Sequence, residues 1–257
     1  MVLQTYKGEI VTAGMVDVSV RKIFKKSKGF LLRRDYDSIT KWKVTGVIAT
    51  SLLTNSVVGI ALQKGANFIL CLESGLENSN SILSNSRILE VCYKNDILVY
   101  EIGSPWSMEP EIFYQLLSKL TDNDGLTFFT IPEITMAHVV IYFKEPIPLR
   151  GIFDRLIVGA ITFSQKSVSD HDTKRAIILE KFESLDPIAN LGIDCLLTFQ
   201  LNPELMSFSR KNKILSIIVN HQQWLNEFLR IIILEVANKL GCPIIPVFEL
   251  SAKFRVL

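Results

Sequence analysis

The side chains that could support acid–base or metal chemistry are few and scattered along the chain. Glu73 and His221 each follow an apolar, strand-like run, whereas the triplet 170–172 (Asp-His-Asp) lies in a polar stretch that predicts a solvated loop. His138 begins another apolar run, where a structural role is expected. A dinuclear metal site needs about five converging His and carboxylate ligands. Glu73 and His221 fall short of that number, and each could equally cap a helix or form a hydrogen bond.

Common catalytic motifs do not occur in the chain. It contains no GxGxxG, P-loop, GxSxG or HExxH segment. No two of its cysteines form a CxxC pair, so we expect buried, reduced thiols of the kind found in cytosolic proteins. These cysteines are Cys71, Cys92, Cys195 and Cys242.

A basic cluster without any acidic residue lies near the N-terminus. It consists of Arg21, Lys22, Lys25, Lys26, Lys28, Arg33 and Arg34. One interpretation is the solvated face of a helix, predicted over about 16–28. The other is a phosphate-binding patch for RNA or DNA. Only Phe24 and Phe30 are interleaved with the charges, so such binding would contact the nucleic-acid backbone and not the bases.

The elements that must position these side chains follow a repeat. GANFILCLE (65–73) matches GIDCLLTFQ (192–200), and KNDILVYEI (94–102) matches KNKILSIIV (211–219). Each copy predicts strand, helix, strand, helix and strand, followed by an amphipathic helix. The first copy has strands at 44–49, 65–73 and 96–100, helices at 55–64 and 87–94, and the amphipathic helix at 110–120. The second has strands at 175–179, 192–200 and 214–219, helices at 186–191 and 203–211, and the amphipathic helix at 224–240.

This order predicts an α/β fold of two similar strand–helix–strand halves with mostly parallel sheets. Further strands are expected at 137–143 and 244–248, a helix at 148–158, and a loop or hairpin at 164–174. The turn-forming residues at 122–125 divide the chain into an N-terminal lobe, 1–124, and a C-terminal lobe, 125–257, packed around a central cleft.

The carboxyl ends of the predicted strands locate the candidate binding residues, because ligands of parallel α/β sheets collect there. The candidates at these ends are Glu73, Ser104, Trp106, Gln200 and His221.

Composition narrows the class of protein further. The 257 residues are 48% hydrophobic and 21% charged, which supports a packed core. No window has the roughly 18 uncharged apolar residues of a membrane span, and the N-terminus lacks an apolar signal-peptide core, so we expect a cytoplasmic protein that does not contact membranes. A net charge of +2 does not by itself indicate nucleic-acid binding.

Four segments together resemble the Nif3-like family, over roughly residues 35–257. They are KVTGVIATSLLTNSVVGIALQKGANFILCLE (43–73), ILVYEIGSPW (97–106), and the stretches 192–200 and 214–225. The resemblance implies a dinuclear metal centre, assembly into rings or dimers, and an activity often labelled GTP cyclohydrolase or metal-binding hydrolase.

The chain departs from the metal-ligand pattern that the resemblance implies. Leu72 stands at the first implied histidine, and Gln200 and Leu225 stand at two implied glutamates. The implied aspartate/histidine region is replaced by Gly103, Ser104 and Pro105. At two of the implied positions, the side chains present, Glu73 and His221, could still coordinate a metal.

These departures predict a Nif3-like protein without metal or other cofactor. We expect it to be non-catalytic and to act by self-assembly as a homo-oligomer or by binding a protein or nucleic-acid partner. The alternative is a metal-dependent hydrolase with a remodelled site, in which Glu73 and His221 hold the metal and Ser104 and Gln200 bind substrate.

Overall fold

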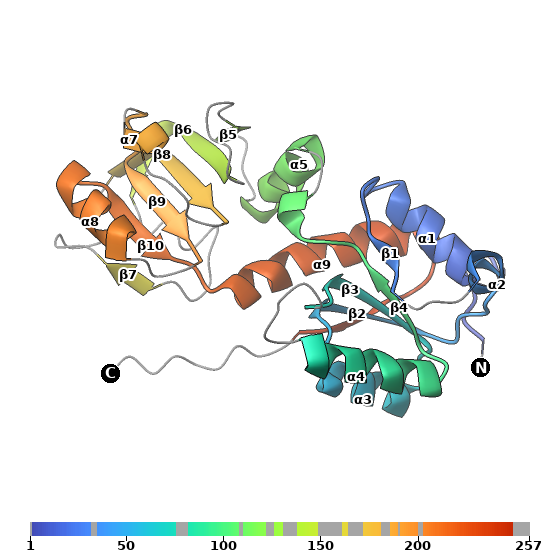
Figure 1. Cartoon of the computed structure of the whole chain (residues 1–257). Coiled ribbons are helices and arrows are strands. Elements are labelled where there is room, and N and C mark those ends of the chain that lie inside the picture. Colours follow the sequence, from blue (N-terminus) through green and yellow to red (C-terminus); the bar gives the residue numbers. More distant parts are fainter. Residues whose placement is uncertain are drawn as a thin grey trace. The chain divides into compact units, whose positions relative to one another are not determined.

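The computed structural model describes residues 2–31, 35–75, 82–107, 110–121, 126–130, 138–148, 161–163, 172–180, 186–189, 191–199 and 203–248 (Figure 1). Across these residues, no helix is long and apolar enough to cross a membrane. The chain forms two compact units, one of Met1–Phe113 with Leu225–Leu257 and the other of Tyr114–Trp224. The C-terminal strand thus belongs with the N-terminal residues, whereas a division into 1–124 and 125–257 would place it in the second lobe.

The first unit is built on a five-stranded sheet in the order β1-β4-β3-β2-β11. Strands β2, β3 and β4 run parallel to one another, β11 runs parallel to β2, and β1 is antiparallel to β4. The bounds are β1 (Gly29–Phe30), β2 (Val47–Leu52), β3 (Phe68–Glu73), β4 (Leu98–Glu101) and β11 (Ile245–Val247). The predicted strands at 44–49, 65–73, 96–100 and 244–248 all occur in this sheet.

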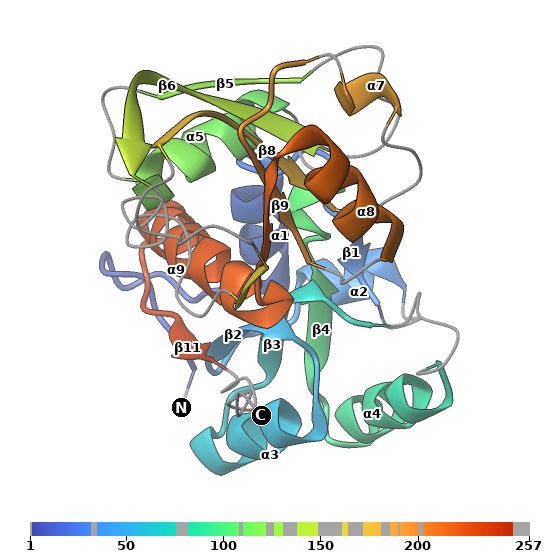
Figure 2. The ribbon, with the colours of Figure 1, turned by 90° about the vertical axis from the view of Figure 1, so that its left-hand side faces the viewer.

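Helices cover both faces of this sheet, which explains why nearly every residue of its central strands β2, β3 and β4 is buried. Helices α3 (Asn55–Lys64) and α4 (Ile82–Lys94) lie on one side, and α1 (Ala13–Arg21) and α9 (His221–Leu240) on the other (Figure 2). The core under α3 and α4 includes Ile48, Ile69 and Val99 from alternate strand positions. The intervening side chains, such as Leu70 and Tyr100, therefore point to the opposite face.

Local capping sets the ends of α3. The Thr54 hydroxyl accepts a hydrogen bond from the Val57 amide at the start of the helix, and Gly65 ends it with a left-handed φ of 64°. The predicted strand at 65–73 consequently begins later, at Phe68, because its leading glycine belongs to the helix cap.

The second unit contains a six-stranded mixed sheet in the order β5-β6-β8-β9-β10-β7. Its bounds are β5 (Leu126–Phe129), β6 (His138–Pro148), β7 (Ile161–Phe163), β8 (Asp172–Leu179), β9 (Cys195–Thr198) and β10 (Leu215–Ile218). Only β8, β9 and β10 are mutually parallel; β5, β6 and β7 add antiparallel pairings. The α/β class is confirmed, while the mostly parallel arrangement holds for the first sheet and for the repeat strands of the second.

Several predicted boundaries in the second unit change. Pro148 ends β6 and does not open a helix, and 172–174 belong to β8 and not to a loop. The rest of the predicted helix at 148–158 lies outside the described residues, as does the rest of the loop at 164–174. The helices of this unit include α7 (Asp186–Ala189) and α8 (Pro203–Asn212).

The predicted repeat is present in the strand order of both sheets. The elements β2-α3-β3-α4-β4 correspond to β8-α7-β9-α8-β10, and the two copies continue into α5 (Pro110–Thr121) and α9. In both sheets an antiparallel strand from earlier in the chain, β1 or β7, lies beside the third strand of the repeat. The duplication therefore extends one strand further than the sequence indicated.

Candidate functional site

Glu73 and Ser104 lie just at the carboxyl ends of two neighbouring parallel strands. Glu73 is the last residue of β3, and Ser104 follows β4 after Gly103, whose φ of 110° is in the region that favours glycine. The Gly103 amide donates to the Leu72 carbonyl (2.9 Å), so pairing with β3 continues past the end of β4. The structure thus places both predicted candidates at the same edge of the first sheet.

Trp106 contributes to an aromatic stack in the first unit. It lies in the 3₁₀ turn η1 (Pro105–Ser107), and its ring centroid is 5.0 Å from that of Phe113. Phe113 in turn stacks on Phe228 of α9 with ring centroids 5.5 Å apart. Contacts of this kind stabilise packing between a turn and two helices.

The positions that the resemblance assigns to metal ligands include two buried leucines of the first unit. Leu72 has 0% of its surface exposed and Leu225, in α9, has 1%. Leu72 alternates with Cys71, which belongs to the core under α3 and α4, so its side chain points to the opposite face of β3. Both leucines are packed as core residues.

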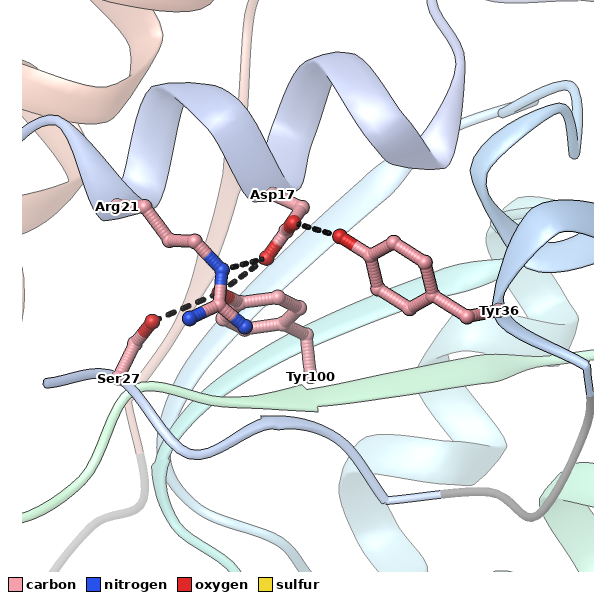
Figure 3. Close-up of polar contacts among 5 residues, drawn as sticks. All are labelled: Asp17, Arg21, Ser27, Tyr36 and Tyr100. Atoms are coloured by element: carbon pink, nitrogen blue, oxygen red, sulfur yellow. Dashed lines mark hydrogen bonds and ion pairs between the residues drawn. The ribbon is translucent and has the colours of Figure 1, made fainter. Parts of the chain in front are cut away.

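A buried carboxylate beside β4 organises a polar cluster that no sequence motif indicated (Figure 3). Asp17 of α1, which is 2% exposed, accepts hydrogen bonds from Arg21 Nε (2.7 Å), Tyr36 Oη (2.5 Å) and Tyr100 Oη (2.7 Å). The Ser27 and Tyr100 hydroxyls are hydrogen-bonded at 2.8 Å. We name these five residues the Asp17 cluster. It joins α1, the turn after α1, α2 (Tyr36–Thr40) and β4.

The surroundings of the Asp17 cluster keep both tyrosines protonated. The hydrogen bond to Asp17 and, to a lesser extent, burial raise the pKa of Tyr36. Burial is the main cause that raises the pKa of Tyr100, and the hydrogen bond to Asp17 adds to it. Both hydroxyls therefore act as hydrogen-bond donors to the Asp17 carboxylate.

Further buried polar groups near the carboxyl ends of β2 and β4 are also engaged. Glu101, the last residue of β4, is 3% exposed and pairs with Lys28 at 2.8 Å between Oε1 and Nζ. The buried Ser51 hydroxyl donates to Asn226 Oδ1 of α9 at 2.6 Å. These contacts lie within the first unit and link α9 and the turn after α1 to the sheet.

Two cations of the basic cluster pair with buried carboxylates: Arg21 binds Asp17 and Lys28 binds Glu101. Lys22, Lys25 and Lys26 lie between them and are exposed. Arg33 and Arg34 lie outside the described residues. The helix predicted over 16–28 was too long, because α1 ends at Arg21 and the chain turns so that Phe24 is buried.

His221 lies in the second unit at the start of α9. Its ring meets that of Phe199 edge to face, with centroids 5.1 Å apart, and Phe199 also contacts Trp224. Asn220 caps the helix, since its Oδ1 accepts from the Gln223 amide (3.0 Å). Burial lowers the pKa of His221 and the nearby Glu180 offsets this in part, so the imidazole is neutral at pH 7. Gln200 lies outside the described residues.

His221 should make the stability of the protein depend on pH below neutrality. Because its pKa is lower in the folded than in the unfolded protein, the unfolded state takes up this proton first as the pH falls. The stabilisation that comes from keeping His221 neutral is complete above about pH 6.5, the usual pKa of histidine. It is lost as the pH falls toward the pKa of His221 in the folded protein. We expect the free energy of unfolding to decrease less between pH 7 and pH 5 in His221→Gln than in the wild type, as measured by urea titrations. Equal decreases would contradict this prediction.

The remaining candidates have structural surroundings. His138 is a buried residue at the start of β6, and Asp172 begins β8, while Asp170 and His171 lie outside the described residues. The four cysteines are free and buried, as predicted. Burial raises the pKa of Cys92 and of Cys242 to about 11, which makes these thiols poor nucleophiles at neutral pH. In the described part of the chain, no three His, Cys, Asp or Glu side chains are grouped so that they could hold a metal ion.

Comparison with solved structures identifies the fold. Two sheets, each containing three parallel strands joined by helices, define a duplicated α/β protein, and no family model matches the chain. The chain is similar to Staphylococcus aureus protein SA1388, with 14% identity and a TM-score of 0.66 over 96% of this chain and 99% of that one. It is similar to a Bacillus cereus protein related to NIF3, with 12% identity and a TM-score of 0.65 over 97% and 100%. It is also similar to reduced HcgD from Methanocaldococcus jannaschii, with 14% identity and a TM-score of 0.65 over 93% of this chain and 99% of that one. The chain therefore has the NIF3-like fold, which confirms the fold expected from the resemblance.

Proposed function

We propose that this NIF3-like protein does not use a metal centre and acts by binding, either to further copies of itself or to another macromolecule. The observation that carries the proposal is the packing of Leu72 and Leu225. Both stand where the resemblance to the family implies metal ligands, and both are buried almost completely.

The residues present do not fit a dinuclear metal centre. Leucine offers no donor atom, and an apolar side chain beside an ion raises the cost of removing that ion from water. Gly103 supplies no side chain, and the Ser104 hydroxyl is a weaker ligand for transition metals than the implied aspartate or histidine. Glu73 and His221 could still coordinate, but two ligands fall short of the roughly five that a dinuclear centre needs.

The buried polar groups near the strand ends support the same proposal. Glu101 is neutralised by Lys28, and Ser51 is bonded to Asn226. A buried carboxylate that already has a cation and a buried hydroxyl that already has an acceptor contribute to the integrity of the unit.

Metal analysis of the purified protein tests the proposal. We expect well under one equivalent of zinc, iron or manganese per chain after purification without chelators, measured by inductively coupled plasma mass spectrometry. Adding Zn²⁺ or Mn²⁺ should change the melting temperature of the wild type no more than it changes that of a His221→Ala variant. His138→Ala is the matched control, because it removes another histidine, one that the resemblance does not assign to a metal.

The contrary result would favour the remodelled hydrolase. If the wild type retained a stoichiometric metal that His221→Ala lost and His138→Ala kept, the protein would have to be regarded as a metal-binding protein. Glu73 would then be the next residue to replace, and hydrolytic activity would be the next measurement.

A further inference from the structure

We infer that the exposed lysines after α1 form a surface that binds the phosphate backbone of nucleic acid. This inference rests on the proposed binding function and names its partner. The surface consists of Lys22, Lys25 and Lys26, with Arg21 and Lys28 at its two ends, and we refer to it as the basic turn.

The charge of the basic turn is large relative to that of the whole protein. The chain carries 28 basic and 26 acidic residues, so its net charge is 28 − 26 = +2. Residues 17–28 contain five cations and one acid, and Glu101 pairs with Lys28, which leaves 5 − 2 = +3 around this segment. The rest of the chain is therefore net negative. A local excess of this kind creates a field that attracts a polyanion even though the protein as a whole is nearly neutral.

Buried partners hold both ends of the basic turn in place. Arg21 is bonded to Asp17 and Lys28 to Glu101, and both carboxylates are almost completely buried. Between them, Phe24 packs into the core and the Ser27 hydroxyl is hydrogen-bonded to Tyr100. The backbone that presents the exposed lysines is thus anchored before any partner binds, which lowers the entropic cost of binding.

Stabilisation of the α1 C-terminus accounts for only part of this charge. Cations in the last turn of a helix offset the partial negative charge of its free carbonyl groups, and this effect falls off within one turn. It applies to Arg21, the last residue of α1, and to Lys22, which caps the helix. Lys25 and Lys26 lie beyond it. Their exposure on an anchored turn therefore fits recognition of an external anion better than support of the helix.

The chemistry of the basic turn favours nucleic acid over a lipid surface. Peripheral membrane binding combines basic residues with apolar side chains that insert below the headgroups. Here Phe24 is buried, and the large exposed apolar residue of α1 is Val18. Lysine ammonium groups act as point charges on phosphates and do not read bases. The expected partner is accordingly a duplex or structured nucleic acid, bound without sequence preference.

Fluorescence anisotropy with short labelled duplexes of DNA and of RNA tests this inference. The test variant is Lys22→Glu with Lys26→Glu, and the control is Lys64→Glu with Lys239→Glu, two exposed lysines in the last turns of α3 and α9. Each pair changes the net charge by −4, from +2 to −2, so the two variants are matched in total charge. Thermal melts establish that both are folded.

We expect the wild type to bind at least one duplex with an affinity that falls steeply as KCl rises. The slope of log K against log[salt] changes by about 0.9 for each phosphate contact that is lost. The test variant should therefore bind at least about tenfold more weakly at low salt and show a slope shallower by about 2, while the control variant should stay within a factor of about 3.

Three results would overturn the inference. They are no binding of the wild type to either duplex at low salt, equal losses in the two variants, and binding to vesicles containing phosphatidylserine but not to nucleic acid. The metal content of the same preparations separates this inference from the proposed function. If the protein is free of metal but does not bind nucleic acid, the partner inferred here is wrong. The proposed function, a protein that uses no metal centre and acts by binding, is then still supported.

Discussion

Replacing Asp17 with alanine is expected to destabilise the first unit by about 3 kcal/mol. The substitution removes the common acceptor of Tyr36, Tyr100 and Arg21. A buried hydroxyl that loses its acceptor costs about 1–3 kcal/mol, and the Tyr100 side chain is fully buried. Arg21 contributes less, because its side chain is 43% exposed and can be solvated. A loss of this size is a large fraction of the 5–15 kcal/mol that stabilises a typical domain.

Urea unfolding followed by circular dichroism measures the difference in the free energy of unfolding between Asp17→Ala and the wild type. Asp37→Ala is the matched control, since Asp37 is an exposed acid on α2 whose loss should change the free energy of unfolding by no more than about 0.5 kcal/mol. Tyr100→Phe removes only one hydroxyl and should cost less than Asp17→Ala. If Asp17→Ala were as stable as Asp37→Ala, the Asp17 cluster would not be a stabilising feature.

The sequence predicted those parts of the fold whose signals are local. The runs of apolar residues that became β3 and β9 are continuous, and the glycines before them mark helix ends and turns, so the repeat could be recognised. Strands β1 and β7 were missed because they have only two and three residues, and no periodicity can be read from so few. Strand β6 was predicted at 137–143, but its antiparallel direction was not, because strand direction depends on the path of the chain between strands.

The polar contacts of the candidate site were not predictable in the same way. Asp17 and Tyr100 are 83 positions apart, and Lys28 and Glu101 are 73 apart. Such pairs form only when the fold brings α1 and the turn after it beside β4. The basic cluster was visible as a charge pattern, but the pattern could not show that Arg21 and Lys28 pair with the buried carboxylates of Asp17 and Glu101.

Leu72 could be singled out by position, because the resemblance implies a metal ligand there, but its environment could not be predicted. An apolar residue at a strand end can line an open cleft or complete a core, and these alternatives differ in energy. The structure shows complete burial, and this distinction bears directly on whether the site could ever accommodate an ion.

Replacing Leu72 with alanine is therefore expected to cost about 2–5 kcal/mol, the range for removing a buried leucine side chain and leaving a cavity. Leu62→Ala is the matched control: Leu62 lies on α3 and is 45% exposed, so the same chemical change should cost less than about 1 kcal/mol. Urea unfolding of the two variants measures the difference. Equal and small losses would mean that Leu72 lines a solvated cleft, and the space beside β3 would again be open to a ligand. A large loss confined to Leu72→Ala would mean that the position at which the resemblance implies the first metal ligand is part of the core, so that a ligand side chain could be placed there only at the expense of the stability of the unit.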